Sequence, residues 1–368
     1  MFEATQKLGG LLRSAIAKNR LPHDVLDWDI DGIIEMGVDT QTGQCLGKDI
    51  TIHGLLNDGF DAVFLSLGGW DSRLSRGTNA GDEKPVPGLH LLMDVSKALK
   101  QTTPPGITCG KHTILAGGGE LAIQTAILCK ENGADTTTVI FRESSEDSGL
   151  PAEALDKATK NGIHLIFGAG INKLFGEKDQ LNKIEYIDQK SGTLHTLPAD
   201  TLVIASGRFP ELIFARPVME EQDTQETPSE EEKTANDAQW EGFYALKNPH
   251  YNEVGLLAEG DVLSDYSGAI KAIGAGRRAA ASIHNVIYGI PLSHPENVLT
   301  LTTMVQNVDE IEGVEPHSRT LMPIANVSER LMDAEIEKGF SEKKSKKEAA
   351  RCLQCGLICY EKTGTENN

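Results

Sequence analysis

The chain has 368 residues, enough for two domains, and its 39% hydrophobic content is enough to form packed cores. Its net charge of −19 argues against nucleic acids and anionic membrane surfaces as partners, because binding to phosphates requires clustered lysine and arginine. No apolar run approaches the roughly 20 residues of a membrane-spanning helix, and no signal peptide follows Met1, so we expect a cytoplasmic protein.

Periodicity predicts helices and short strands in the first third of the chain. We expect helices over 24–35, 49–57 and 89–99 and a strand over 37–44. Thr51 is a candidate N-cap for the second helix. The apolar run 61–68 ends in glycine, which is typical of a strand buried in a parallel sheet.

The stretch from Ile114 to Ala122 combines an apolar strand, a glycine turn and the first turn of a helix. Gly117, Gly119 and Ala122 match the G-x-G-x-x-G/A dinucleotide fingerprint. The first glycine makes the bend, the second lets the backbone approach a pyrophosphate, and the third small residue lets helix and strand pack closely. The helix N-terminus then offers N–H groups to the phosphates. We predict a dinucleotide site here; the alternative is an α/β domain whose glycine turn binds nothing.

Alternating elements continue to the C-terminus. Helices are predicted over 121–131, 150–160, 269–287 and 343–351, and strands over 136–141, 164–167, 184–188, 194–197, 201–207 and 255–261. Gly168-Ala-Gly170 resembles a phosphate-binding turn, but no helix is predicted after it in the right register. The run 219–237 carries eight acidic residues against Lys233 alone, which favours a solvated linker over a surface for a basic partner.

Several motifs resemble those of the flavoprotein small subunit of glutamate synthase and its relatives, over residues 1 to about 290. They are Gly9-Gly-Leu-Leu12, Arg20-Leu-Pro22, Gly47-Lys-Asp-Ile50, the run 61–68, Gly117-Gly-Gly119, Ala205-Ser-Gly-Arg-Phe-Pro210, Gly260-Asp261 and Ala272-Ile-Gly-Ala-Gly-Arg277. The resemblance implies an α/β fold with two Rossmann-like dinucleotide-binding domains of the glutathione-reductase type. It implies an FAD domain in two parts (1–112 and 246–300), an NAD(P)-binding domain (113–218), an acidic linker (219–245) and a C-terminal cysteine-containing extension (301–368).

The resemblance also implies that the FAD domain is incomplete at its N-terminus. In this family the domain opens with a strand, a glycine turn and a helix, and its second strand ends in an acid that binds the adenosine ribose. Phe2-Glu-Ala4 matches the end of that second strand, with Glu3 as the acid. We therefore expect residues 1–368 alone to be poor in flavin and prone to aggregation. A βα unit of about 30 residues, supplied in cis or by a partner, should restore FAD.

Cofactor contacts follow from the resemblance residue by residue. The expected cofactor-binding residues are Gly117, Gly118, Gly119, Glu120, Ala122, Arg142, Glu143, Gly207, Glu3, Gly10, Arg20, Leu21, Gly260, Asp261 and Ala269. Asp261 would bind the FAD ribityl chain, or alternatively only cap the following helix, whose N-terminus would stabilise reduced flavin. Hydride passes directly from nicotinamide C4 to flavin N5, so no catalytic acid or base is assigned.

The segment Phe141-Arg-Glu-Ser-Ser-Glu146 follows the strand whose end contacts the adenosine ribose. An acid at this place favours NAD, whereas arginines favour the 2′-phosphate of NADP, and NADP-using relatives often carry paired arginines. Arg142 keeps the first position, but Glu143 takes the second, and Glu146 adds a further negative charge. We therefore expect NADH to be preferred; the alternative is that Arg142 and Glu143 pair with each other and discriminate nothing.

Three of the six cysteines cluster as Cys352-x2-Cys355-x3-Cys359. The cluster resembles that of relatives inside multi-subunit iron–sulfur complexes, and thiolate ligands suit a 4Fe-4S cluster. Such a cluster takes four ligands, and the fourth is open among Cys45, Cys109, Cys129, a cysteine of another chain and a non-cysteine group. Zinc held by three cysteines and a partner, or a tail of free thiols, are the alternatives. The only C-x-x-C motif lies in this tail, which argues against dithiol chemistry beside a flavin.

These features together predict an NAD(P)H-dependent FAD oxidoreductase. Its expected role is that of an electron-transfer flavoprotein subunit between NAD(P)H and an iron–sulfur partner, with other iron–sulfur or flavin redox subunits as partners. A non-catalytic assembly subunit that binds one cofactor or none is the first alternative. A true glutamate synthase small subunit is the second; in that protein the cysteine-rich region precedes the FAD domain, whereas here it follows.

Overall fold

The structure, a computed structural model, describes residues 1–68, 86, 88–100, 107–205, 210–217, 238–245, 268–290, 300–301, 318–330, 335–351 and 360–361. The chain divides into two units. The first comprises Met1–Ala15 and Ile30–Leu292, and the second comprises Ile16–Asp29 and Ser293–Asn368. The α/β fold predicted from the sequence is confirmed.

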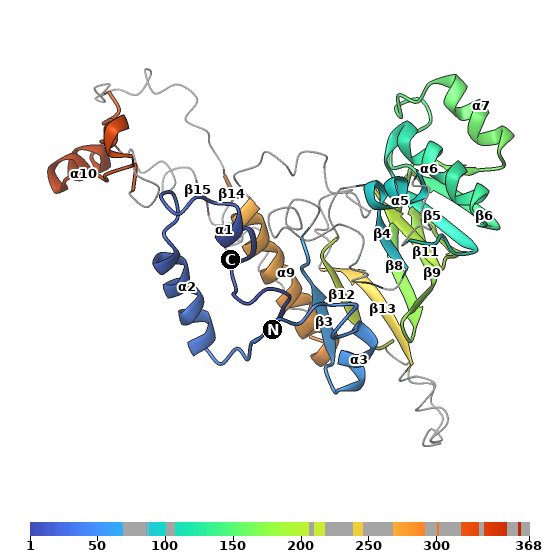
Figure 1. Cartoon of the computed structure of the whole chain (residues 1–368), viewed down its shortest axis with the longest axis horizontal. Helices are drawn as coiled ribbons and strands as arrows, with labels where there is room; N and C mark the ends of the chain where they lie inside the picture. Colours follow the sequence, from blue (N-terminus) through green and yellow to red (C-terminus); the bar gives the residue numbers. More distant parts are fainter. Residues whose placement is uncertain are drawn as a thin grey trace, which may run out of the picture. The chain divides into compact units, whose positions relative to one another are not determined.

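A five-stranded parallel sheet lies at the centre of the first unit. Its order is β4 (Leu89–Leu91), β11 (Thr201–Ile204), β5 (His112–Ala116), β6 (Thr136–Ile140) and β7 (His164–Ile166). Three helices pack on one side of this sheet (Figure 1): α5 (Leu92–Lys100), α6 (Gly119–Glu131) and α7 (Ala152–Lys160). The helices and strands predicted between residues 111 and 167 are therefore confirmed, within one or two residues at each end.

An antiparallel sheet of six strands packs against the other side of the parallel sheet. Its order is β10 (Leu194–Pro198), β9 (Gln180–Asp188), β8 (Ala169–Glu177), β13 (Gln239–Tyr244), β12 (Leu212–Ala215) and β3 (Ala62–Leu65). Helix α9 (Gly268–Tyr288) contacts β12. As predicted, no helix follows Gly168-Ala-Gly170, because Ala169 begins β8 and the backbone continues in an extended conformation.

Alternating side chains of the parallel strands enter two separate cores. In β5, Leu115 faces the helices together with Ile123 and Val139. Its neighbours Ile114 and Ala116 instead face the antiparallel sheet and share a core with its strands. This alternation follows from the two-residue period of a β-strand, and it explains why the parallel strands are apolar at nearly every position.

Three expectations from the sequence are wrong in detail. The apolar run 61–68 does not enter a parallel sheet: β3 pairs antiparallel with β12 and, among the described residues, ends its sheet. Residues 89–99 begin with strand β4 before helix α5, so the parallel sheet starts well before residue 113. The linker expected over 219–245 contains β13, which is paired on both sides.

The remaining elements are short or isolated in the sequence. They are β1 (Phe2–Glu3), α1 (Gly10–Ser14), α2 (His23–Glu35), β2 (Gln41–Thr42), α3 (Ile52–Asn57), β14 (Thr300–Leu301), η2 (Val327–Glu329), α10 (Glu342–Ala349) and β15 (Tyr360–Glu361). The Thr51 side chain accepts a hydrogen bond from the Gly54 N–H and caps α3 as predicted. Strands β1 and β2 form a parallel pair, shorter than the strand expected over 37–44. The strand expected over 255–261 lies outside the described residues.

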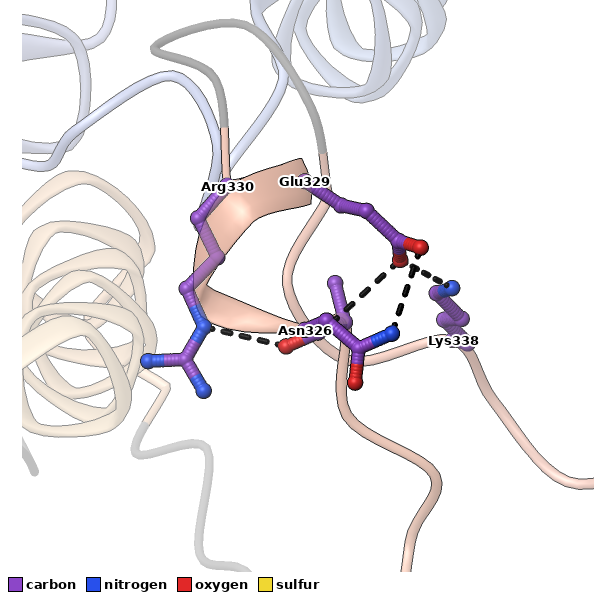
Figure 2. A network of polar contacts seen from close by, with 5 residues as sticks. Asn326, Glu329, Arg330 and Lys338 are labelled. Carbon is purple, nitrogen blue, oxygen red and sulfur yellow. Dashed lines mark hydrogen bonds and ion pairs between the residues drawn. The ribbon is translucent and has the colours of Figure 1, made fainter.

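In the second unit, polar contacts fix the turn around η2 (Figure 2). The Glu329 carboxylate accepts a hydrogen bond from Lys338 Nζ at 2.9 Å and a longer one from Asn326 Nδ2 at 3.3 Å. Arg330 Nε donates to the Ala325 carbonyl at 3.1 Å. The Lys338 ammonium and the Asn326 groups hold the pKa of Glu329 below its usual value. In the same unit, the carboxylate of Glu348 on α10 accepts a hydrogen bond from Thr320 N–H at 2.8 Å and pairs with Arg351.

We predict that Gly176→Ala destabilises the protein. Gly176 of β8 lies directly opposite Trp240 of β13, and an added Cβ would come 1.8 Å from Trp240 Cζ2. Trp240 cannot withdraw easily, because it is buried and its Nε1 donates to the Lys178 carbonyl at 2.7 Å. Overpacking of this kind costs about 1–3 kcal/mol, measurable by urea unfolding.

Gly32→Ala is the matched control for this substitution. Gly32 lies inside α2 with no atom within 4 Å of an added Cβ, so alanine should stabilise the helix by about 0.5–1 kcal/mol. Equal unfolding midpoints for the two variants would contradict the packing described for Trp240.

Candidate functional site

The predicted glycine turn connects β5 to α6 as the sequence indicates. Gly117, Gly118 and Gly119 all have positive φ values, of 70°, 98° and 57°. L-residues with side chains disfavour this region, so the turn depends on glycine. The Gly117 N–H donates to the carbonyl of Ile140, the last residue of β6, at 2.9 Å. The turn is therefore fixed beside the carboxyl ends of β5 and β6.

Helix α6 begins without a side-chain cap. The first bond of the helix runs from the Ala122 N–H to the Gly118 carbonyl, so the N–H groups of Gly119, Glu120 and Leu121 have no acceptor within the helix. The N-cap residue is Gly118, which has no side chain to accept from them. Three donors at the positive end of the helix dipole form a site suited to a phosphate group.

The two central glycines of the turn have different surroundings. A Cβ on Gly118 would meet Leu92 Cδ2 at 2.7 Å and Ala205 Cβ at 2.9 Å. A Cβ on Gly119 would meet no atom within 4 Å. Ala122 is completely buried between helix and sheet. Gly118 and Ala122 therefore permit the close packing of α6, whereas Gly119 faces open space where a ligand can approach the backbone.

The segment after β6 carries Arg142 and Glu143. The Glu143 carbonyl accepts a hydrogen bond from Gly168 N–H at 2.9 Å, and its side chain is exposed. Arg142 is half-buried, and its positive charge acts on Tyr244 of β13. Burial raises the pKa of Tyr244 well above its usual value, and the Arg142 guanidinium opposes this shift. The Tyr244 hydroxyl is buried without a hydrogen-bond partner.

A hollow of about 430 Å³ opens beside this segment, and we call it the β6–β7 hollow. It is lined by Arg142, Ser144, Ser145, Phe167, Gly168, Asp188, Gln189 and Lys190. Asp188 ends β9, and Gln189 and Lys190 belong to the turn between β9 and β10, which is close to the β6–β7 end only through folding. Among the lining residues, only Arg142 was predicted from the sequence to bind a cofactor. No motif in the sequence identifies the other lining residues.

The residues predicted to bind FAD are only partly described. Glu3 ends β1, and its carboxylate accepts two hydrogen bonds of 2.7 Å from the backbone and hydroxyl of Thr5. Gly10 begins α1 with a φ of 49°, and Ala269 is exposed in the first turn of α9. In the second unit, Arg20 forms an exposed ion pair with Glu337 at 3.7 Å and Leu21 is half-buried. Gly207, Gly260 and Asp261 lie outside the described residues.

The six cysteines comprise a tail group of three, a hydrogen-bonded pair and Cys45. Cys352, Cys355 and Cys359 lie outside the described residues, and the described residues hold no cluster of three or more potential metal ligands. Cys109 Sγ and Cys129 Sγ lie 2.9 Å apart and share a hydrogen bond. That bond lowers the pKa of Cys109 and raises the pKa of the buried Cys129. The pair lies at the N-terminal side of β5, away from the glycine turn.

Comparison with known families decides the identity of this fold. The family described as pyridine nucleotide-disulphide oxidoreductase matches residues 25–237, more than half of the chain. The chain belongs to this family. Membership implies binding of FAD and NAD(P)H, and the match includes the glycine turn and the whole parallel sheet. No helix in the described part of the chain is long and apolar enough to span a membrane.

Curated relatives are similar along most of the chain, at low identity. The NADP(+)-dependent formate dehydrogenase subunit beta of Moorella thermoacetica is 28% identical, over 100% of this chain and 53% of the relative. The NADPH-Fe(3+) oxidoreductase subunit beta of Geobacter sulfurreducens is 25% identical, over 94% and 56%. The glutamate synthase (NADPH) small chain of Escherichia coli K12 is 25% identical, over 77% and 62%. The chain thus spans about half the length of the first two relatives.

We predict that Gly119→Ala weakens binding of NAD(P)H at least about tenfold, because its methyl group would occupy the space from which a phosphate reaches the helix N-terminus. The substitution should destabilise the fold by only about 1–2 kcal/mol, which is the cost of placing alanine in the left-handed backbone conformation. Gly118→Ala should lower the melting temperature further, because its Cβ also collides with Leu92 and Ala205. Fluorescence titration with NADH and NADPH, beside thermal unfolding, measures both effects. Unchanged affinity in folded Gly119→Ala protein would contradict the assigned site.

Proposed function

We propose that this chain is an electron-transfer flavoprotein subunit, which moves electrons between NAD(P)H and an iron–sulfur partner through FAD. The observation that carries the proposal is the uncapped start of α6: three backbone N–H groups have no acceptor within the helix, and no atom lies within 4 Å of a Cβ added to Gly119. Family membership supplies the cofactor pair. Two of the relatives are beta subunits of oxidoreductases, which supports a role as one part of a larger complex.

The nucleotide-binding part of the proposal assigns roles to described residues. The N–H groups of Gly119, Glu120 and Leu121 would bind the pyrophosphate, and the helix dipole would favour its negative charge. Ala122 lets α6 pack close to β5 and so holds these donors in place. Arg142 and Glu143 follow β6, where the adenosine ribose would lie. When bound, NAD(P)H would supply a hydride, and FAD would accept it and release the two electrons one at a time.

The flavin part of the proposal rests on residues at the ends of elements. Glu3, Gly10, Arg20, Leu21, Gly207, Gly260, Asp261 and Ala269 would hold FAD. Glu3 fits this role, because Thr5 orients its carboxylate at the carboxyl end of a parallel strand, where such ligands bind. Ala269 fits it as well, because its small side chain is exposed in the first turn of α9.

The cysteine motif supplies the proposed exit for electrons. Cys352, Cys355 and Cys359 would be ligands of a 4Fe-4S cluster. They follow α10, which Glu348 fastens to the backbone of Thr320. Cys129 is an unsuitable fourth ligand, because its sulfur is buried and hydrogen-bonded to Cys109. The candidates for the fourth ligand are therefore Cys45, Cys109, a cysteine of another chain and a non-cysteine group.

The proposal is tested by anaerobic reduction of the protein purified together with its partner chains. We expect a visible flavin absorbance spectrum, and we expect NADH or NADPH to bleach it by reducing the flavin. The Gly119→Ala variant should keep the flavin colour but bleach at least about ten times more slowly at limiting nucleotide. A complex that holds no flavin, or a flavin that neither nucleotide reduces, would favour an assembly subunit instead.

A separate measurement tests the cluster. We predict about four iron and four sulfide per chain after reconstitution without oxygen, and loss of both in Cys355→Ser. Cys129→Ser is the control and should keep its iron, because the Cys129 sulfur is buried and hydrogen-bonded to Cys109. Zinc without sulfide in the wild-type protein would refute the iron–sulfur assignment.

A further inference from the structure

The β6–β7 hollow lies where the 2′-phosphate on the adenosine ribose of a dinucleotide would be recognised. The glycine turn is fixed to the end of β6 by the hydrogen bond from Gly117 to Ile140. A dinucleotide whose pyrophosphate binds at Gly119 carries its adenosine ribose to the residues after β6. Arg142, Ser144 and Ser145 are those residues, and all three line the hollow. The hollow is therefore within reach of the ribose 2′ position.

The lining of the hollow is suited to an anion. Arg142 and Lys190 supply two positive charges, and Ser144 and Ser145 supply two hydroxyl groups. Arginine and lysine are favoured ligands of phosphate groups, and a serine hydroxyl can donate to a phosphate oxygen. Glu143 and Glu146, on which the expectation of NADH was based, are exposed and do not line the hollow. Their negative charges are therefore screened by solvent.

One acid, Asp188, does line the hollow, but one of its two carboxylate oxygens already accepts hydrogen bonds. Asp188 Oδ1 accepts hydrogen bonds from Lys190 N–H at 3.0 Å, from Ser191 N–H at 2.7 Å and from the Ser191 hydroxyl at 2.9 Å. These bonds direct the carboxylate into the β9–β10 turn. Asp188 therefore shapes the turn that carries Lys190, and three donors stabilise its carboxylate within that turn.

The turn itself is held firmly in place. The Asp188 N–H donates to Thr193 at 2.9 Å and the Gly192 N–H donates to Asp188 at 2.8 Å, which closes the turn. The Gln189 N–H donates to the Gly168 carbonyl at 2.8 Å, and Gly168 N–H in turn donates to Glu143. This chain of bonds connects the β9–β10 turn to the segment after β6. Lys190 is thus fixed at the backbone beside Arg142, although 48 positions separate the two in sequence.

We propose that the β6–β7 hollow binds the 2′-phosphate of NADPH, and that Lys190 is a specificity-determining residue supplied by the antiparallel sheet. The inference rests on the proposed function, since it names the nucleotide of the same site. It replaces the expectation of NADH with a preference for NADPH. Arg142 and Lys190 bind the phosphate from two sides, and Ser144 and Ser145 complete its hydrogen bonds.

The experiment compares nucleotides and variants in the protein purified with its partner chains. We expect wild-type kcat/KM for NADPH to exceed that for NADH by more than about tenfold. Lys190→Gln should lower kcat/KM for NADPH about tenfold, through KM, and leave NADH nearly unchanged. Lys190→Arg should restore the preference. Lys183→Gln is the control, because Lys183 lies on β9 over the Phe175 ring, 4.5 Å from its centroid, and does not line the hollow.

Direct binding separates the possible failures. Adenosine 2′,5′-bisphosphate should bind at least about tenfold more tightly than adenosine 5′-monophosphate, and Lys190→Gln should remove that difference. Equal binding of NADH and NADPH, or an NADPH preference that Lys190→Gln leaves intact, overturns this inference while the proposed function stands. Absence of binding to every one of these nucleotides overturns the proposed function and this inference with it.

Discussion

Apolar packing between the two sheets of the first unit is the interaction on which the rest of the structure depends. Ile114 and Leu202 of the parallel sheet share one core with Phe214, Trp240 and other residues of the antiparallel sheet. Burial of each such side chain contributes about 1.5–3 kcal/mol. Because the sheets are pressed together, a turn of one lies over the strand ends of the other. The β6–β7 hollow exists only as a result of this packing.

Local patterns were sufficient to predict the nucleotide-binding unit. The run from β5 through the glycine turn to β6 combines strong periodicity with a motif whose residues are adjacent in sequence. Its glycines have positive φ values, and the fingerprint places glycine there because the tight turn requires that conformation. Thr51 was recognisable as a cap because its partner lies three residues away. Information of this kind needs no knowledge of distant contacts.

The antiparallel sheet was only partly predictable, because β8, β9 and β10 pair with their neighbours in sequence, whereas the pairings of β3, β12 and β13 join distant segments. An apolar run such as 61–68 fits a parallel or an antiparallel partner equally well, and only the pairing with β12 decides between them. Strand β13 was not predicted, because it lies at the end of the predicted linker and its apolar residues Trp240 and Phe243 stand among polar ones. Lys190 escaped notice because its relation to Arg142 arises from the fold and from no motif. Prediction therefore succeeded where sequence neighbours interact and failed where they do not.

The two-sided pairing of β13 has a consequence for how the chain tolerates variation. Backbone bonds to β12 and β8, together with buried Trp240, hold β13 in the sheet. Closure of a longer connection between β12 and β13 costs little, since the entropy of a loop grows only with the logarithm of its length. The chain can therefore carry a run of eight carboxylates between these strands, and insertions or deletions there should be tolerated during evolution without change to the sheet.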